Sequence, residues 1–335
     1  HDAAKLAEFD SITDQLGYRK EVILRELEKA KVDLEKIDAF VGRGGGLLPV
    51  EGGTYKVDEI LLNDARRGAN GVSHPAQLGS LIANEFAVKY NKPAFVVNPP
   101  DTDELITEAR ITGIKGVYRN VHLHALNLKE TAIRHSDLIG KKYEECNYVV
   151  CHIGGGISIS AHRKGKMIDG NDIVGGEGPM TPTRCGSISA AEMIRYAYDH
   201  PDKKETLSLT TKTGGFVNQL GTSDALEVIR RADEGDKKAE LIWNTMTYQI
   251  IKYIGAMAAA LHGKVDGILL GGGMVHNERL VKDITEACSW MAPVSAYPGE
   301  FELEAMAAGA IRVLSGVEEA KNYSGKACWN ENECD

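Results

Sequence analysis

The pattern of apolar and polar positions predicts a chain in which helices and strands alternate. Apolar residues recur at the three- and four-residue spacing of amphipathic helices in several segments. These predicted helices cover residues 3–31 (as one or two helices), 58–67, 75–90, 123–139, 189–198, 223–231, 237–261, a segment from about 277, and 302–314. Short apolar or β-branched runs predict strands at 37–41, 54–57, 94–97, 121–123, 148–151, 157–160, 267–270 and 293–297. Such an alternation is typical of an α/β protein.

Residues 148–160, YVVCHIGGGISIS, are the stretch around which the other candidate features are arranged. Gly154, Gly155 and Gly156 join two apolar runs, and a polar turn at 163–166 precedes a third extended segment. This order predicts a β-meander, whereas a Walker loop would lead from a strand into a helix. Glycines accept φ > 0 and let backbone N–H groups approach an anion closely. An ordinary hairpin turn with extra glycine is the alternative.

Glycine clusters also follow two other predicted strands, at 42–46 and 271–273. Three such clusters in one cleft between two α/β domains would make a nucleotide site, because each supplies donors without side-chain bulk. The segment 170–186 lacks periodicity, and a loop of this length inside a domain is usually functional. Arg43 and Arg184 lie in glycine-rich segments, where a guanidinium can reach phosphate or carboxylate. A solvated surface arginine is the alternative for both.

Two histidines are candidate donors to a phosphoryl oxygen. His152 directly precedes the glycine turn, and His124 follows the strand-like segment 121–123. The chain has no HExxH pattern and no carboxylate at triad spacing, which argues against a metal-ligand role for them. A structural role is the alternative, and it is the one assigned to His122, which alternates away from His124 in a strand.

Glu302 and Glu304 stand at the start of the last predicted helix. Carboxylates at that position complement the helix dipole, which is the structural interpretation. The functional interpretation is a magnesium site, since Mg²⁺ needs only one or two carboxylates together with phosphate oxygens.

Two features of the C-terminal part carry structural expectations. In the helix predicted over 237–261, Ile242, Met246 and Ile250 lie on one apolar stripe, and a run of alanines follows. Small side chains let a second helix approach closely, so we expect a central helix or an interface helix. The polar segment after Gly316 predicts a loosely ordered tail.

The composition narrows the class of protein. The 335 residues carry a net charge of −9, which argues against a broad nucleic-acid or membrane surface. No apolar run approaches the ~20 residues that span a bilayer. None of the six cysteines forms a CxxC pair, so we expect reduced thiols in a cytoplasmic protein without a zinc site. The length suits about two domains, and Pro99-Pro100 with the acidic residues after it marks the expected junction.

Several segments together resemble the acetokinase family, on its butyrate kinase branch. They are CHIGGGISISAHRKGKMID, GPMTPTRCGS, LGTSDA, LLGGG and YPGEFELEAMAAGAIRVL, within a resemblance that extends from residue 3 to about 323. It implies the two-domain, actin-like ATPase fold with a nucleotide cleft between the domains. Residues 1–100 would form the N-terminal domain, and 101–302 a C-terminal domain that binds nucleotide and dimerises. Residues 303–335 would add a helix that packs back on the N-terminal domain, and a tail.

The activity that the resemblance implies is reversible, in-line phosphoryl transfer from ATP to a short-chain fatty acid such as butyrate. The products would be butyryl phosphate and ADP, with Mg²⁺ as the accompanying ion. The implied state is a homodimer without nucleic-acid or membrane partners. Acetate, propionate or a branched-chain acid is the alternative acceptor, and phosphohydrolysis is an alternative reaction on the same fold. A nucleotide-binding module without catalysis is the alternative outside enzymes.

The resemblance also implies roles position by position. Arg43 and Arg184 correspond to two catalytic arginines, and Arg43 would face the carboxylate and the transferred phosphoryl group. His124 corresponds to the histidine of the family's FHG-type stretch, and Glu302 to the glutamate associated with magnesium. The nucleotide is assigned to His152, Gly154, Gly155, Gly156, Asp224, Gly271, Gly272 and Gly273.

Three positions depart from the family pattern. Asn98 stands where the family carries aspartate, so Asp101 or Asp103 has to serve, and we assign the role to Asp103. Leu226 stands where an arginine is expected after Asp224, which affects nucleotide stacking. The family's opening hairpin with its Asn-x-Gly-Ser/Thr phosphate loop has no match here, so we expect the first strands of the N-terminal domain to be missing from this sequence.

Overall fold

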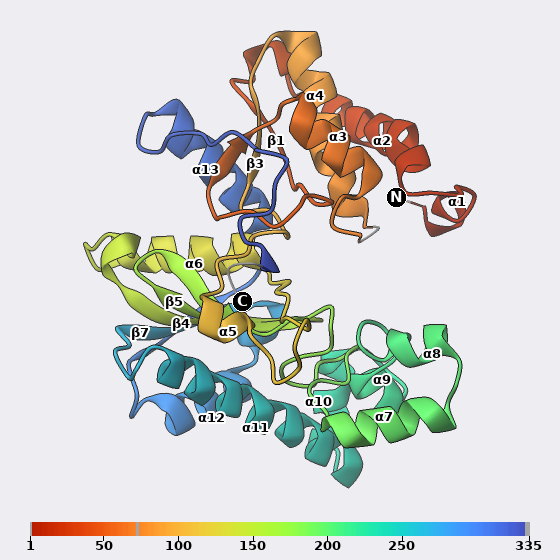
Figure 1. Ribbon diagram of the computed structural model, residues 1–335, viewed down its shortest axis with the longest axis vertical. Coiled ribbons are helices and arrows are strands. Elements are labelled where there is room, and N and C mark those ends of the chain that lie inside the picture. The colour runs from red at the N-terminus through yellow and green to blue at the C-terminus, as the bar shows by residue number, and fades with distance from the viewer. Residues whose placement is uncertain (1, 72–73, 332–335) are drawn as a thin grey trace. The chain divides into compact units, whose positions relative to one another are not determined.

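The computed structural model describes residues 2–71 and 74–331. These residues form two compact units, which are described separately below (Figure 1). Unit 1 combines the residues up to Asp103 with those from Glu302 onward, and unit 2 runs from Glu104 to Phe301. Unit 1 is therefore assembled from two segments that are distant in the sequence, whereas the bulk of unit 2 is contiguous.

Unit 1 is built on a three-stranded sheet in the order β1-β3-β2. Its strands are β1 (Phe40–Gly42), β2 (Thr54–Lys56) and β3 (Ala94–Val97). The central strand β3 is parallel to β1 and antiparallel to β2, and all four of its residues are buried, as its apolar sequence predicts. The helices of the N-terminal part are α1 (Ala3–Leu6), α2 (Leu16–Lys29), α3 (Glu59–Arg67) and α4 (Leu78–Tyr90).

Helix α4 lies against β1 at unusually close range. A Cβ on Gly42 would overlap the backbone of Gly79, and a Cβ on Gly79 would lie 2.6 Å from the Arg43 nitrogen. Glycine at both positions lets the strand and the helix meet backbone to backbone. This contact fixes the end of β1, which is where Arg43 leaves the sheet.

The returning segment covers the same sheet. Helix α13 (Glu302–Leu314) packs on β1, β2 and β3, and the tail after it is held in place around residues 321–323, contrary to the expectation of loose order. The Lys56 N–H donates to the Lys321 carbonyl at 2.9 Å, and the Lys321 N–H donates to the Thr54 carbonyl at 2.8 Å. The Tyr323 hydroxyl donates to Asp64 at 2.6 Å. Backbone pairing of this kind leaves no mark in side-chain polarity, which is why the composition of the tail misled the prediction.

Unit 2 is built on a five-stranded sheet in the order β6-β5-β4-β7-β8. The predicted meander is confirmed, because β4, β5 and β6 pair antiparallel in sequence order, while β7 and β8 extend the sheet in parallel from β4. The strands are β4 (Asn147–Ile153), β5 (Ile157–Arg163), β6 (Lys166–Gly170), β7 (Gly267–Gly272) and β8 (Val294–Pro298).

Alternate residues of β4 serve two cores, one on each face of this sheet. Val149 and Cys151 join the larger cluster with α11 (Lys237–Ala260) and α12 (Glu278–Cys288), whereas Tyr148 and Val150 join the cluster under α6 (Ala125–Leu138). The long helix α11 therefore runs beneath the sheet and α6 above it (Figure 1). Met246, Ile250 and Ile254 of the predicted stripe are fully buried, so α11 is a central helix.

The remaining helices of unit 2 divide by length. Helices α7 (Ala190–Asp199) and α10 (Ala225–Asp233) fall where they were predicted, within two residues at either end. The sequence missed α5 (Thr107–Arg110), α8 (Lys203–Ser208) and α9 (Gly215–Leu220), which have only four to six residues and cannot show apolar periodicity. The strand predicted at 121–123 is wrong, because this segment is irregular and packs on α6.

Within residues 2–71 and 74–331, no helix combines the length and the apolar character needed to cross a bilayer. The cysteines in this part of the chain are free thiols, as expected, at positions 146, 151, 185, 288 and 328. Cys334 lies outside the described residues.

Candidate active site

The glycine turn 154–156 follows the carboxyl end of β4 in the middle of the unit 2 sheet. The Gly154 N–H donates to the Gly156 carbonyl at 3.1 Å, and none of the three glycines adopts a positive φ. A conformational need for glycine is therefore the wrong reason for this turn. The reason is space: a Cβ on Gly154 would lie 3.2 Å from His152 Nε2, and a Cβ on Gly156 would overlap the Arg184 guanidinium.

The two predicted histidines meet beside this turn. The rings of His124 and His152 are stacked, with centroids 3.9 Å apart and planes inclined by 21°. Ser158, on β5, holds the first of them: its Oγ lies 2.8 Å from His124 Nδ1 and accepts from the His124 backbone N–H at 3.2 Å. His152 is buried, and its Nε2 lies 3.6 Å from a carboxylate oxygen of Glu300.

Ser158 Oγ can serve His124 Nδ1 as donor or as acceptor, because a hydroxyl oxygen has two lone pairs and one proton. When Ser158 donates to Nδ1, the ring proton of neutral His124 lies on Nε2. In that tautomer His124 offers a donor on the side of the ring away from Ser158.

Arg184 completes the group. Its Nε and Nη1 are buried and have no hydrogen-bond partner among the described residues. Burial lowers the pKa of Arg184 from its usual value, and the negative charge of Asp172 partly offsets that effect. Two buried guanidinium nitrogens with unused donors are costly unless an anion binds to them, so this geometry is that of an anion site.

Thr181 links the arginine to the glycine turn. Its hydroxyl donates to the Gly155 carbonyl at 2.9 Å and accepts from the Arg184 backbone N–H at 3.1 Å. The Thr181 N–H in turn donates to the Arg184 carbonyl at 3.1 Å. The turn that carries Arg184 is thus tied directly to the turn that follows β4.

The third glycine cluster lies beside the first. Gly271 is the register partner of His152, because β7 runs parallel to β4. Gly272 has φ +100°, and a Cβ there would overlap the backbone of Ile153, so glycine is required at that position. Both clusters therefore lie at the carboxyl ends of neighbouring strands, the edge at which α/β sheets bind ligands.

Asp224 lies at the start of α10. It is the N-cap of α10, and its carboxylate accepts from the Leu226 N–H at 2.9 Å and the Glu227 N–H at 3.4 Å. Leu226 points outward, with 77% of its surface exposed. The described contacts of Asp224 do not bring it to the glycine clusters.

Unit 1 holds the remaining predicted residues around Arg43. Its Nε lies 3.5 Å from Glu302 Oε1, and its Nη1 donates to the Asn98 carbonyl at 3.5 Å. Burial lowers the pKa of Arg43, against the opposing charges of Glu302 and Asp101. The arginine expected to face substrate and the glutamate expected to hold magnesium are therefore paired with each other.

The backbone of Asp103, after β3, is held by two contacts, and the role assigned to its carboxylate stays a prediction. Asp103 is buried, its N–H donates to the Val50 carbonyl at 2.8 Å, and its carbonyl accepts from the Cys328 thiol at 3.2 Å. Asn98 has φ +38°, a conformation that asparagine tolerates, and its side chain accepts from the Gly53 N–H at 2.7 Å.

The sequence is similar to known proteins over nearly its whole length. A profile of the Acetokinase family matches residues 115–292. Two proteins described as probable butyrate kinases, from Clostridium botulinum strains Alaska E43 and Eklund 17B, are each 43% identical to it over 324 residues. The alignments cover 96% of this chain and 91% of each relative. The chain belongs to the acetokinase family.

Solved structures agree with membership of the acetokinase family. The acetate kinase of Porphyromonas gingivalis matches with a TM-score of 0.74 at 22% identity, over 88% of this chain and 84% of that one. A propionate kinase of Francisella tularensis subsp. tularensis SCHU S4 matches with a TM-score of 0.68 at 18% identity, over 85% and 82%. At these identities the likeness concerns the fold, and it confirms the predicted actin-like ATPase class.

Within this acetokinase, sequence reasoning missed the residues that hold the predicted ones in place. Ser158 and Thr181 fix His124 and Arg184, and Glu300 pairs with His152. The sequence did contain a signal for Ser158. Serines at 158 and 160 alternate with isoleucines at 157 and 159 on β5, a pattern that indicates a polar face on a strand. Thr181 and Glu300 lie outside helices and strands, where no periodicity points to them.

The side chains available to bind Mg²⁺ are few. Among the residues that the structure describes, no three histidine, cysteine or acidic side chains gather in a way that could hold a metal. Glu302 is nevertheless a carboxylate with 42% of its side chain exposed, beside the cationic Arg43. This fits Mg²⁺ bound mainly by nucleotide phosphates with one protein carboxylate, as is common for that ion.

Proposed function

We propose that this acetokinase transfers the γ-phosphoryl group of ATP to butyrate, and that it runs the reverse reaction from butyryl phosphate and ADP. Family membership makes it a carboxylate kinase, and the relatives described as probable butyrate kinases support this acceptor. The observation that carries the proposal is the buried Arg184 guanidinium with unused donors beside two stacked histidines and a glycine turn.

The reaction needs no covalent intermediate with the protein and no general base. A short fatty acid has a pKa of about 4–5, like other carboxyl groups, so at neutral pH it is already an ionised nucleophile and needs no general base. Catalysis then consists of alignment and of neutralising the charge spread over the transferred oxygens. A fixed guanidinium and fixed N–H donors supply this neutralisation without reorganisation during the reaction.

We assign the donors as follows. Arg184 Nε and Nη1 stabilise the oxygens of the transferred phosphoryl group, and His124 donates to it through Nε2. His152 lies in stacking contact with His124, and two positive rings at 3.9 Å would repel each other, so the two histidines are not both charged. The backbone N–H groups of Gly155 and Gly156 hold the nucleotide phosphates, since the Gly154 N–H already donates within the turn.

Arg43 and Glu302 of unit 1 serve the acceptor and the cation. Arg43 holds the carboxylate in the fork geometry that suits planar anions. Glu302 would hold Mg²⁺, which when bound neutralises charge on the phosphates. The ion pair between the two side chains keeps both in place before ligands bind.

The test is a coupled assay of ADP release with acetate, propionate, butyrate, valerate and isobutyrate, scored by kcat/KM. We expect a maximum at butyrate, with about 10–200-fold lost per missing methylene in a closed apolar site. Arg184→Ala should lower kcat by about 10²–10³ while ATP binding persists. Arg195→Ala, on the exposed face of α7, is the matched control.

Two results would count against the proposal. ATP binding without turnover on any acid would make the protein a nucleotide-binding module. Near-normal turnover of Arg184→Ala would remove the residue on which the mechanism depends.

We also propose that the protein is a homodimer that associates through unit 2. Large apolar side chains stand exposed on its helices, including Ile194 and Tyr198 on α7 and Tyr248 on α11, at 58%, 84% and 61%. Large apolar side chains exposed on helices support an association surface when they lie together, and the proposal takes these helices to form it. Sedimentation equilibrium of Tyr198→Asp, with Leu303→Asp in unit 1 as control, should show monomer only for the first variant.

A further inference from the structure

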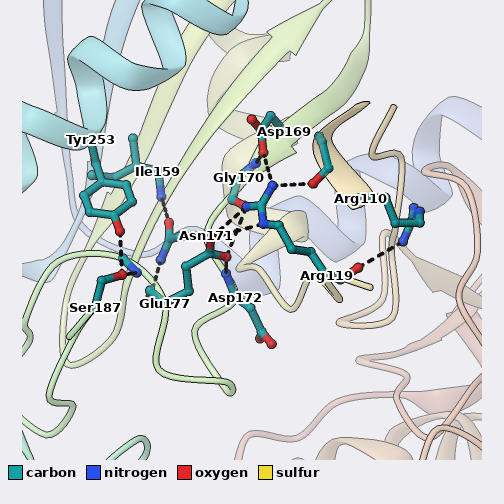
Figure 2. Close-up of polar contacts among 12 residues, drawn as sticks. Arg110, Arg119, Ile159, Asp169, Gly170, Asn171, Asp172, Glu177, Ser187 and Tyr253 are labelled. Atoms are coloured by element: carbon teal, nitrogen blue, oxygen red, sulfur yellow. Dashed lines mark hydrogen bonds and ion pairs between the residues drawn. The ribbon is translucent and has the colours of Figure 1, made fainter. Parts of the chain in front are cut away.

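Arg119 draws three segments of unit 2 together around one guanidinium (Figure 2). Its Nη2 donates to the Gly170 carbonyl at 2.8 Å, and its Nη1 donates to Asp169 Oδ1 at 3.0 Å and to the Ala109 carbonyl. Its Nε donates to Glu177 Oε1 at 3.1 Å. The planar fork of arginine is suited to such a junction, which a lysine could satisfy only in part.

Glu177 connects Arg119 to the start of the loop 171–187. Its Oε2 accepts from Arg119 at 3.1 Å and from the Asp172 N–H at 2.9 Å. Its carbonyl accepts from Asn171 Nδ2 at 3.2 Å.

Asn171 then connects the loop to β5. It accepts from the Ile159 N–H at 2.7 Å (Figure 2). It also donates to the Ile157 carbonyl at 3.0 Å. The loop is thus fixed to the strand that follows the glycine turn.

The other end of the loop is closed by a second contact. The Ser187 N–H donates to the Gly178 carbonyl at 2.8 Å, and the Gly178 N–H donates to Ser187 Oγ at 3.0 Å. Ser187 Oγ also lies 2.6 Å from the hydroxyl of Tyr253 on α11. Residues 178–187 are therefore closed into a turn by the contacts between Gly178 and Ser187. Glu177 directly precedes this turn, and Arg184 lies within it.

We propose that Arg119 is a positioning residue for phosphoryl transfer, and that it sets the direction of Arg184 through Glu177 and the base of the loop 171–187. The inference rests on the proposed function, since it assigns Arg119 to the same reaction. Arg184 Nε and Nη1 have no hydrogen-bond partner in the described part of the chain, so the direction of the guanidinium depends on the loop backbone.

Asp172 adds an electrostatic link along the same route. Its N–H is held by Glu177, and its Oδ1 lies 3.0 Å from His122 Nδ1. Although burial opposes it, the hydrogen bond and charge of His122 hold the pKa of Asp172 below its ordinary value. An ionised Asp172 near Arg184 favours the charged guanidinium, so Glu177 fixes both the place and the electrostatic partner of that arginine.

The test is a double-mutant cycle between Arg119 and Arg184, followed by kinase turnover. Arg119→Lys should lower kcat by about 10–100-fold, because misplacing a catalytic group by about 1 Å costs up to ~10²-fold. In the Arg184→Ala background the same change should lower kcat by less than about twofold, since the group being positioned is gone. Glu177→Gln is the second variant, in case Arg119→Lys does not fold. Arg231→Lys is the matched control, because Arg231 also joins a carboxylate, Asp236, to a carbonyl, that of Leu220.

Hydrogen exchange on the same samples separates this inference from the proposed function. We expect amides of residues 172–187 to exchange at least about tenfold faster in Arg119→Lys, with β4 unchanged. Equal loss of kcat in both backgrounds, or unchanged exchange in the loop, would overturn the role of Arg119. A wild-type protein without kinase turnover would instead overturn the proposed function, and the exchange result would still decide whether Arg119 holds the loop.

Discussion

The guanidinium of Arg184 occupies the space that a side chain at position 156 would need. A Cβ built on Gly156 would overlap Arg184 Nη1 and would lie 3.1 Å from His124 Cε1. The backbone of the glycine turn, the arginine and the histidine therefore meet at a residue without a side chain. The glycine is present to make room for the guanidinium and the imidazole, and not because the turn needs an unusual φ.

Gly156→Ala should lower kcat by about 10²–10³, comparable to the loss of a transition-state donor, because Arg184 must move away from the added methyl group. Steady-state kinetics of the coupled kinase reaction measure this. Gly155→Ala is the matched control, since a Cβ there meets no atom within 4 Å. Equal effects of the two substitutions would show that the overlap with Arg184 is not the cause.

Ser158→Ala should lower kcat by about 10–100-fold with little change in the KM for ATP, because His124 loses the contact that orients its ring. Ser160→Ala provides the comparison on the same face of β5. Ser160 bonds to His162 and not to the stacked pair, so its loss should reduce thermal stability and leave kcat near the wild-type value. A kcat as low for Ser160→Ala as for Ser158→Ala would argue that the whole strand, and not His124, had been disturbed.

The buried His162 should make the folded protein less stable as the pH falls below about 6.5. Burial lowers its pKa well below the ordinary value, and the charge of Lys129 adds to this effect. Between the pKa of His162 in the folded protein and its higher pKa in the unfolded chain, only the unfolded chain binds the proton. The free energy of unfolding therefore decreases as the pH is lowered. One such group contributes a slope of at most about 1.4 kcal/mol per pH unit.

Urea unfolding at a series of pH values checks this. The slope should be smaller in His162→Gln than in the wild type, even though the variant loses the contacts to Tyr143 and Ser160 and is less stable overall. His262→Gln, at the exposed turn after α11, controls for the loss of one histidine. An unchanged slope in His162→Gln would contradict the assignment.

Two glycines in helices should respond in opposite directions to alanine. On α13, a Cβ on Gly309 would overlap Val97 of β3, so Gly309→Ala should lower stability by about 1–3 kcal/mol. On α11, a Cβ on Gly255 meets no atom within 4 Å, so Gly255→Ala should raise stability by about 0.5–1 kcal/mol through helix propensity. Chemical denaturation measures both, and the same sign for the two would refute the packing of α13 on β3.

The sequence predicted correctly the helices and strands in which the apolar pattern extends over several repeats. The meander at β4–β6 and the central helix α11 carry many residues of one period, so their type was predicted correctly. The C-terminal tail was predicted wrongly, because Lys321 and Tyr323 are held by backbone pairing and a buried hydroxyl contact that polarity does not reveal.

The candidate site was predictable in its members and not in its geometry. His124, His152, Gly156 and Arg184 do come together, as expected for residues around strand ends. Asp224 caps its own helix, which is the ordinary role of aspartate before a helix start, and its assignment to the nucleotide stays a prediction. Arg119 gave no signal, because its partners come from segments about 10, 50 and 58 positions away, and no short-range pattern records such contacts.

The split composition of unit 1 has a consequence for synthesis on the ribosome. Strand β3 emerges early, but α13, which covers it at Val97, emerges only after the whole of unit 2. At about 5–20 residues per second, the intervening chain takes on the order of ten seconds or more to be made. During that interval Val97 lacks the helix that covers it in the finished protein, so unit 1 can complete its fold only after all of unit 2 has been made.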